Sequence, residues 1–315
     1  MRPELIDDVS QSALDPAGVG ATQIVDLFHW MVGGGVVIWL IVVGLSVYSI
    51  VVPGGHRPRL TKTLVIGGGA VVPTVVLSSL LCYALAMLPE LHRPPPSDSP
   101  TVKVNGVRWW WRVQYQTDDG RTIETANEIR LPVDEAVEFK LTSEDVIHSF
   151  WIPSLGGKVD MIPGRETRLK LYPTRVGKFR GVCAEYCGTA HAQMRFDVTV
   201  MPRPEFNRWL SNQSSDAREP SQQSAIRGGE LFRRKGCGAC HTIRGTDARG
   251  RVGPDLTHLA SRSSLGAATK PNNTENLRHW ITHTHHVKPG VTMPAFQALD
   301  EREVDAIVAY LEQLH

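Results

Sequence analysis

The sequence is poor in cysteine and has almost no surplus of charge of either sign. Its 315 residues contain five cysteines, too few for the disulfide framework of a small secreted protein. The 34 Lys and Arg residues nearly balance the 32 Asp and Glu residues, and a formal charge of +2 argues against a nucleic-acid partner. Hydrophobic residues make up 42% of the chain, which excludes a disordered or collagen-like protein. The length suggests about two folded domains.

One segment near the N-terminus lacks charge almost completely. Between Ala21 and Leu88 the only Asp, Glu, Lys or Arg residues are Asp26, Arg57, Arg59 and Lys62. The uncharged runs Met31–Val52 and Leu64–Leu88 are each long enough for a helix that crosses a hydrocarbon core of about 30 Å. We therefore predict a hairpin of two transmembrane helices, at about residues 28–52 and 64–88, in contact with membrane lipid.

The charges around this hairpin predict its orientation. The connection Pro53–Thr63 carries three basic residues and no acid, so by the positive-inside rule it faces the cytoplasm. The domains that follow the hairpin then lie on the outer side of the cell membrane, periplasmic or extracellular. The segment before the first helix is acidic, whereas a cleaved signal peptide begins with basic residues. We therefore expect the first helix to remain as an anchor.

The sequence pattern changes twice after the hairpin. Val102–Tyr115, Val137–Leu141 and Phe196–Val200 have strand character and are separated by Pro, Gly and Asp turns, which predicts an all-β sandwich. Ser211–Ser224 has no apolar periodicity and indicates a flexible linker. Helical periodicity follows, with a capping box predicted at Asp300 and Glu303. The chain is thus multidomain, with limits predicted at 1–96 for the N-terminal segment and hairpin, 97–210 for the β-domain, 211–224 for the linker and 225–315 for an all-α domain.

Four side chains that bind metals lie within twelve residues of the β-domain. Cys183, Cys187, His191 and Met194 offer two thiols, an imidazole and a thioether, which are soft ligands that favour copper over zinc. Two cysteines four residues apart on a turn can each bridge two metal ions, and each ion then needs a nitrogen ligand. His191 supplies one, and His148 is the candidate for the other. A Cys183–Cys187 disulfide is the alternative interpretation.

A second motif, Cys237-Gly-Ala-Cys240-His241, has the C-x-x-C-H spacing of a covalently attached c-type haem. His241 then binds the iron from one side, and a Met or His further on binds it from the other. Met293 is the only methionine after position 201 and is the predicted ligand. Gly253-Pro254 resembles the turn of cytochromes c whose carbonyl accepts a hydrogen bond from the haem-binding histidine, which implies such a bond from His241. The alternative axial ligands are histidines of the same domain: His258, His279, His283, His285 and His286.

The first motif resembles that of subunit II of the haem–copper cytochrome c oxidases, over about residues 10–210. The resemblance implies a cupredoxin-like sandwich behind a two-helix hairpin, with a dinuclear copper-A centre. It implies that Cys183 and Cys187 bridge two copper ions, with His148 and Met194 on one ion and His191 on the other. Glu185 would bind copper through its backbone carbonyl, and its side chain would bind a magnesium ion at the contact with subunit I.

Further segments support the resemblance, and one departs from it. Trp109-Trp110-Trp111 is similar to the aromatic patch of the family, which implies that electrons reach the copper at Trp109. Residues 225–315 resemble class I cytochromes c. Family members often carry a Glu about seven residues before the proline that matches Pro73, whereas Leu64–Gly68 contains no acid. Cys82 is left over, and we interpret it as a small apolar residue of the second helix.

The resemblance implies an electron-transfer subunit of a membrane cytochrome c oxidase. Electrons would pass from an external donor, such as another cytochrome, through the chain's own haem and copper to subunit I, which reduces oxygen to water; subunit III is a further expected partner. The linker would keep the haem domain near the copper at an effective concentration of around a millimolar. Two alternatives stay open, namely the copper-A subunit of a nitric oxide reductase and a stand-alone membrane-anchored electron carrier. The hairpin argues against the copper domain of nitrous oxide reductase.

Overall fold

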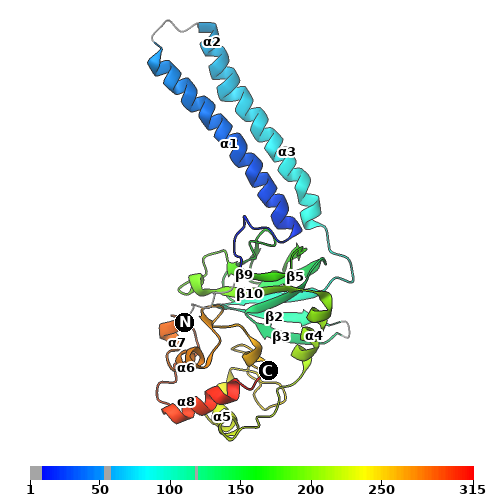
Figure 1. Cartoon of the computed structure of the whole chain (residues 1–315), viewed down its shortest axis with the longest axis vertical. Coiled ribbons are helices and arrows are strands. Elements are labelled where there is room, and N and C mark those ends of the chain that lie inside the picture. The colour runs from blue at the N-terminus through cyan, green and yellow to red at the C-terminus, as the bar shows by residue number, and fades with distance from the viewer. Residues whose placement is uncertain (1–8, 53–57, 118–119) are drawn as a thin grey trace, which may run out of the picture. The chain divides into compact units, whose positions relative to one another are not determined.

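The computed structural model describes residues 9–52, 58–117 and 120–315 (Figure 1). It contains two compact units, one formed by Gln23–Pro94 and the other by the residues up to Thr22 together with Pro95–His315. The smaller unit is the helical hairpin, and the larger unit holds a β-sandwich and a helical domain. Residues 53–57 of the predicted cytoplasmic connection and residues 1–8 of the acidic N-terminal segment lie outside the described residues.

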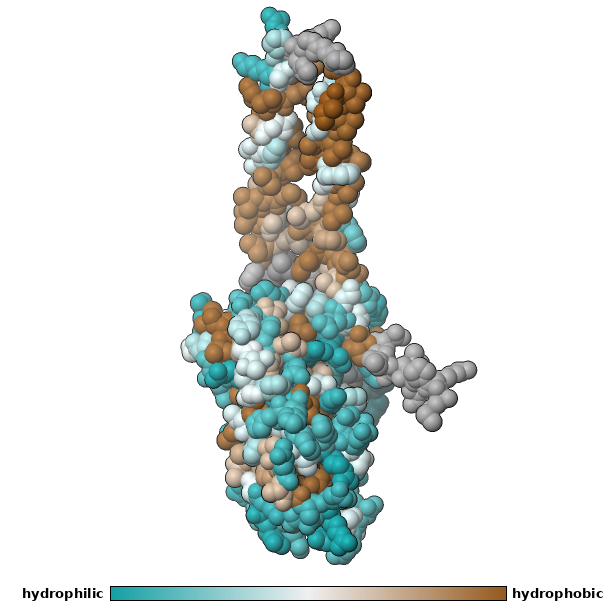
Figure 2. All heavy atoms as spheres, turned by 90° about the vertical axis from the view of Figure 1, so that its left-hand side faces the viewer, coloured by the Kyte–Doolittle hydropathy of each residue, from teal (hydrophilic) through white to brown (hydrophobic). Residues whose placement is uncertain are grey.

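The hairpin consists of two helices that are long and apolar enough to cross a membrane. The first is α1 (Val19–Val51), and the second is built from α2 (Pro58–Thr63), η1 (Leu64–Val71) and α3 (Val72–His92). Their most apolar windows are not buried within the chain, and Figure 2 shows hydrophobic residues over most of their surface. Lipid solvates such surfaces and water does not, so the structure agrees with the predicted membrane hairpin. Both helices begin several residues before the predicted starts.

The second helix contains a π-helical segment, η1, in which hydrogen bonds span five residues instead of four. The N–H of Val72 donates to the carbonyl of Gly67 at its end. Pro73 follows directly and has no N–H, so the ordinary helical bond to the carbonyl of Gly69 cannot form. The wider turn over three consecutive glycines accommodates the proline ring, and the helix continues past it.

Two five-stranded sheets form the predicted β-sandwich. One sheet has the order β3-β2-β1-β5-β8, and the other has the order β4-β10-β9-β6-β7. Parallel pairs β1–β5 and β4–β10 occur beside antiparallel ones. The bounds of the strands are β1 (Thr101–Val107), β2 (Trp110–Gln116), β3 (Thr122–Ala126), β4 (Glu128–Pro132), β5 (Val137–Ser143), β6 (His148–Trp151), β7 (Val159–Met161), β8 (Thr167–Leu171), β9 (Gly177–Cys183) and β10 (Arg195–Met201).

Burial alternates along these strands, so one face of each sheet contributes to a shared core. Trp111, Phe150 and Phe196 meet in this core with ring centroids 4.8 to 5.9 Å apart. The predicted strand segment Val102–Tyr115 is divided into β1 and β2, because the chain reverses over Arg108 and Trp109. This two-residue turn carries Trp109 out of the regular strand.

Residues 9–18 pair with the sandwich and not with the hairpin. The N–H of Ser10 donates to the carbonyl of Lys178, and the N–H of Arg180 donates to the carbonyl of Ser10. At Gly18 a Cβ would lie 2.5 Å from the carbonyl oxygen of Leu155, so this close approach requires glycine. Residues 9–22, which were expected to belong with the hairpin, are therefore part of the larger unit.

The C-terminal part of the chain forms the helical domain. Helix α5 packs closely on α8 at Gly228, where any side chain would collide with the carbonyl of Ala306. Asp300 caps α8 by accepting the N–H of Glu303 at 2.8 Å, whereas the Glu303 carboxylate pairs with Lys235 instead of completing a capping box. The elements are α5 (Gln223–Arg234), η3 (Cys237–Ala239), η4 (Leu259–Ser261), β11 (Ser264–Leu265), β12 (Lys270–Pro271), α6 (Thr274–Thr282), α7 (Thr284–Val287) and α8 (Glu301–Leu311).

The segment expected to be a flexible linker is tied down in the structure. Helix α4 (Arg203–Ser214) extends through its first four residues. The rest binds to the helical domain: the N–H of Ala217 donates to the carbonyl of Arg244, and His258 donates to the carbonyl of Ser215. Backbone hydrogen bonds of this kind leave no trace in the composition, which explains the difference from the prediction.

Candidate functional site

The loop between β9 and β10 brings the predicted copper ligands together. It runs from Cys183 at the end of β9 through the short helix η2 (His191–Gln193) to β10. The Cys187 sulfur lies 3.8 Å from the Cys183 sulfur, 3.5 Å from Nδ1 of His191 and 3.7 Å from the Met194 sulfur. Disulfide sulfurs lie about 2.05 Å apart, so the two cysteines are not bridged. Donor atoms at these separations can share metal ions at bond lengths of about 2.0–2.3 Å.

His148 joins this cluster from β6, on the neighbouring strand. Its Nδ1 lies 3.8 Å from the Cys183 sulfur, and its Nε2 lies 2.9 Å from the carboxylate of Asp145. A carboxylate at one ring nitrogen keeps the proton there and leaves the other nitrogen available to a metal. The ligand atoms of His148, Cys183 and Cys187 all lie within 4.8 Å of one another, and the three residues are buried. These donors therefore fit a buried copper site.

The backbone around Asp145 holds its carboxylate in place. The N–H of Arg108 donates to it at 2.8 Å, and the N–H of Val146 donates at 2.7 Å. Burial acts to raise the pKa of Asp145, but these hydrogen bonds and the one with His148 outweigh it and lower the pKa below its usual value. The carboxylate therefore remains ionised at neutral pH and can orient the imidazole of His148.

The hydrogen bond between the two thiols of the cluster shifts their pKa values in opposite directions. The hydrogen bond with Cys187 lowers the pKa of Cys183 to about 4 in spite of burial, and His148 adds to the effect. The same hydrogen bond raises the pKa of Cys187. One thiolate is therefore present at neutral pH in a buried place, where a cation would neutralise it.

Met194 and Glu185 offer two further ligand atoms of different exposure. The Met194 side chain is fully buried. The backbone carbonyl of Glu185 lies 3.2 Å from the Cys183 sulfur, while the residue itself is exposed. The carbonyl thus faces the cluster, and the carboxylate remains accessible to another group.

Trp109 links the cluster to the turn between β1 and β2. Its indole Nε1 donates to the carbonyl of Cys187 at 2.9 Å. The ring also covers Gly188, where a Cβ would lie 3.1 Å from it. Only 8% of Trp109 is exposed. An aromatic ring is therefore in direct contact with the loop of the copper cluster.

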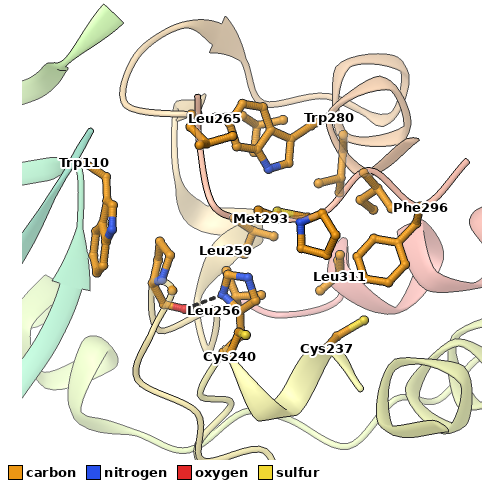
Figure 3. Close-up of a pocket in the computed structure, with 18 of the residues that line it drawn as sticks. Trp110, Cys237, Cys240, Leu256, Leu259, Leu265, Trp280, Met293, Phe296 and Leu311 are labelled. Atoms are coloured by element: carbon orange, nitrogen blue, oxygen red, sulfur yellow. Dashed lines mark hydrogen bonds between the residues drawn. The ribbon is translucent and has the colours of Figure 1, made fainter. Parts of the chain in front are cut away.

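The helical domain contains a cavity of about 360 Å³ lined mainly by apolar side chains (Figure 3). Cys237 and Cys240 border it from η3 and the residue that follows. Nδ1 of His241 lies 2.8 Å from the carbonyl of Pro254, which confirms the expected hydrogen bond. Burial lowers the pKa of His241, so its ring is neutral and Nε2 can bind iron. A Cβ at Gly253 would lie 2.5 Å from this ring, so glycine makes room for it.

Met293 lines the same cavity, and none of the alternative histidines does so within the described part of the chain. His258 is instead buried against the carbonyl of Ser215. His279 and His283 stack on one another with ring centroids 4.9 Å apart, away from the cavity lining. Met293, unlike these histidines, is therefore placed to meet a group bound in this cavity.

The β-sandwich supplies one wall of this cavity. Arg108, Trp109, Trp110 and Asn127 contribute to the lining, and Figure 3 shows Trp110 reaching toward the pocket from its strand. The turn that contacts Cys187 therefore also borders the haem pocket. The sequence reasoning did not assign roles to Trp110 or Asp145. The position of Asp145, three residues before His148 and at the end of a strand segment, is a signal that could have identified it.

These features define a class of protein, a membrane-anchored electron carrier with a copper cluster and a c-type haem pocket. Residues 112–201 match the family model of the periplasmic domain of cytochrome c oxidase subunit II, and residues 225–315 match that of cytochrome c. Cytochrome c oxidase subunit 2 of Alkalihalophilus pseudofirmus is 37% identical over 213 residues, which are 68% of this chain and 60% of that protein. The match thus spans less than two thirds of that relative.

Two further proteins are similar to this chain. Cytochrome c oxidase subunit 2 of Bacillus subtilis is 33% identical over 262 residues, 78% of this chain and 72% of that protein. The solved periplasmic domain of subunit II of cytochrome oxidase from Bradyrhizobium japonicum is 29% identical and aligns with 38% of this chain and 96% of that one, with a TM-score of 0.36.

The chain belongs to the cytochrome c oxidase subunit II family and carries a cytochrome c domain at its C-terminal end. It is thus a component of an oxidoreductase complex. Its two outer domains imply copper and haem as cofactors, and they lie outside the membrane in which the hairpin is anchored.

Proposed function

We propose that this chain carries electrons, one at a time, from an external donor to the catalytic subunit of a cytochrome c oxidase. Haem and copper each supply one-electron redox chemistry, and oxygen is reduced to water in the catalytic subunit. The observation that carries the proposal is the convergence of two sulfurs, two imidazoles and a thioether in one cluster beside Trp109. The relatives are oxidase subunits, so neither a nitric oxide reductase nor a stand-alone carrier is favoured.

The copper cluster is proposed to hold two ions. Cys183 and Cys187 would serve both ions, His148 and Met194 would serve one, and His191 would serve the other. The carbonyl of Glu185 completes the set, supported by its 3.2 Å approach to the Cys183 sulfur. The exposed carboxylate of Glu185 is free to bind magnesium at the contact with the catalytic subunit.

The haem pocket is proposed to attach the macrocycle through Cys237 and Cys240. His241 and Met293 would hold the iron, and the carbonyl of Pro254, 2.8 Å from Nδ1, fixes the orientation of the His241 ring. The apolar lining would keep water from a bound macrocycle and so would influence its reduction potential. We retain 97–210 and 225–315 as the limits of the two functional domains.

Trp109 is proposed to pass electrons to the copper cluster, since its ring bonds to the carbonyl of Cys187 and lines the haem cavity. The catalytic subunit I accepts the electrons from copper. Subunit III is a further partner of the complex, and the external donor is a reduced cytochrome or another one-electron carrier.

The experiment that tests this function measures copper and haem content together with electron paramagnetic resonance on the full chain in detergent. We expect two copper ions that share one unpaired electron and one covalent low-spin haem per chain. A Cys82→Ser chain is the control and should give the same result, because Cys82 is an exposed residue of the hairpin helix α3. A single copper ion, zinc, or a Cys183–Cys187 disulfide would contradict the proposal.

A further inference from the structure

Lys288 is a charged residue that binds neither cofactor and yet is almost completely buried. Only 1% of its surface is exposed. Its Nζ donates to the backbone carbonyls of Trp109 at 2.7 Å, Gln193 at 2.8 Å and Gly266 at 2.8 Å. An ammonium group has three N–H donors, so these bonds satisfy it fully. Burial lowers the pKa of Lys288 to about 7, and the three carbonyls favour the protonated form.

The three carbonyls belong to both domains. Gly266 lies in the helical domain, whereas Trp109 and Gln193 lie in the sandwich. Trp109 bonds to the carbonyl of Cys187, and Gln193 directly precedes Met194. One side chain of the helical domain therefore binds both the copper loop, at Gln193, and the backbone of Trp109, whose ring contacts that loop.

The residues around Lys288 fit closely against the same surface. The side-chain amide of Gln193 donates to the carbonyl of Val287 at 2.9 Å. Gly290, with a positive φ of 83°, lies against the Trp109 ring, and a Cβ there would be 3.0 Å from it. The turn around Lys288 thus covers Trp109 directly.

A second contact joins the domains at a different place. The N–H and hydroxyl of Ser263 donate to the carboxylate of Glu128 on β4. The hydroxyl of Ser264 donates to the carboxylate of Asp197 on β10 at 2.6 Å, and the hydroxyl oxygen of Ser263 lies 3.0 Å from the same carboxylate. Two separated contacts prevent the helical domain from pivoting about either one.

We propose that Lys288 is a positioning residue that fixes the haem domain over Trp109, so that copper receives electrons only from the haem of the same chain. This inference rests on the proposed function. One electron leaves the external donor, a reduced c-type cytochrome, and reaches copper by way of the haem; the donor is oxidised, and no bond or proton changes. Trp109 is only 8% exposed and offers an external donor no direct access. The haem domain is therefore held against the sandwich and does not diffuse on a flexible linker.

Hydrogen exchange tests the fixed contact in the full, cofactor-loaded chain. The N–H of Ser263 donates across the interface and is protected only while the domains are in contact. Lys288→Met removes the donors and keeps the apolar stem. We expect exchange at position 263 to accelerate at least about tenfold, while the amides of Leu277 and Ile281 in α6 keep their protection. Lys270→Met, at an exposed lysine of the same domain, is the matched control and should change nothing.

Rapid mixing with a reduced soluble c-type cytochrome tests the order of electron transfer. In the unaltered chain we expect copper reduction to follow haem reduction. In Lys288→Met we expect an additional phase in which copper is reduced independently of the haem. Copper reduction independent of the haem in the unaltered chain would overturn the proposal, as would unchanged exchange at position 263 in the variant.

A second variant covers the case in which Lys288→Met does not fold, as shown by loss of its haem spectrum. Ser263→Ala combined with Ser264→Ala removes only the hydroxyl groups of the second contact, near the surface. It should also accelerate exchange at position 263, and protection equal to that of the unaltered chain would overturn the fixed interface. Absence of copper or haem from the unaltered chain would instead contradict the proposed function, so the two failures are distinguishable.

Discussion

The copper cluster and the haem pocket are assembled in opposite ways. The copper cluster takes most of its donors from one short loop, where the donor atoms of Cys183, His191 and Met194 lie within 3.8 Å of the Cys187 sulfur. The haem pocket combines residues from Cys237 to Met293 and takes a wall from another domain at Trp110. Bare ions depend on the chain for all their ligands, whereas a haem brings its own ring nitrogens and needs mainly a cavity and two axial ligands.

This difference predicts different responses to the loss of one side chain. At the copper cluster, each cysteine sulfur is proposed to serve both copper ions, so the substitution of one cysteine affects both ions. At the haem pocket, two covalent bonds would hold the macrocycle. The loss of an axial ligand should therefore change the spin state and potential of the haem but not the amount of haem that the chain retains. Three substitutions test this comparison, in order of decreasing effect on cofactor content.

Cys187→Ser should have the largest effect. Its sulfur lies next to Cys183, His191 and Met194, and a hydroxyl is a poor ligand for copper. We expect complete loss of the shared-electron copper signal and of electron delivery to the oxidase, with the haem content unchanged. Metal analysis and electron paramagnetic resonance measure this.

The outcome that would contradict it is a Cys187→Ser chain that still holds two copper ions with one shared electron. Cys82→Ser serves as the matched control, since it removes a thiol in the hairpin and leaves the cluster intact.

Asp145→Asn should weaken copper binding without abolishing it. The carboxylate lies 2.9 Å from Nε2 of His148 and keeps the proton there, whereas an amide holds the ring less firmly. Loss of such a partner typically lowers metal affinity by about 10–100-fold. Competition with a copper chelator measures the change. Asp134→Asn, at an exposed position on the same sandwich, is the control, and equal affinities in the two variants would contradict the role of Asp145.

The sequence was sufficient to predict what depends on local spacing. The absence of charge marks the hairpin, the alternation of apolar residues marks the strands, and C-x3-C and C-x-x-C-H mark the two sites. The bond from His241 to the Pro254 carbonyl was also predicted, although from the resemblance of Gly253-Pro254 to a cytochrome turn and not from spacing.

Contacts between distant parts of the chain could not be predicted in this way. The Lys288 ammonium bonds to a carbonyl 179 residues away, and nothing in its neighbourhood in the sequence distinguishes it from a solvated lysine. The defined conformation of residues 215–221 also depends on partners in the helical domain, such as the carbonyl of Arg244 and the side chain of Gln313. Such contacts follow from the packing of whole domains.

Met293→Ala should have the smallest effect on cofactor content. The thioether bonds of Cys237 and Cys240 hold the haem, so we expect one haem per chain, as in the unaltered protein. The iron loses its second axial ligand, becomes high-spin, and shifts in potential by about 0.1 V or more, within the roughly 0.8 V over which axial ligands tune haem. Visible spectra and redox titration measure both changes. His283→Ala is the matched control, because His283 stacks on His279 outside the cavity lining. A low-spin haem in Met293→Ala together with a high-spin haem in His283→Ala would reverse the ligand assignment. The expected pair of results would show that the haem site, unlike the copper cluster, retains its cofactor when one ligand is lost.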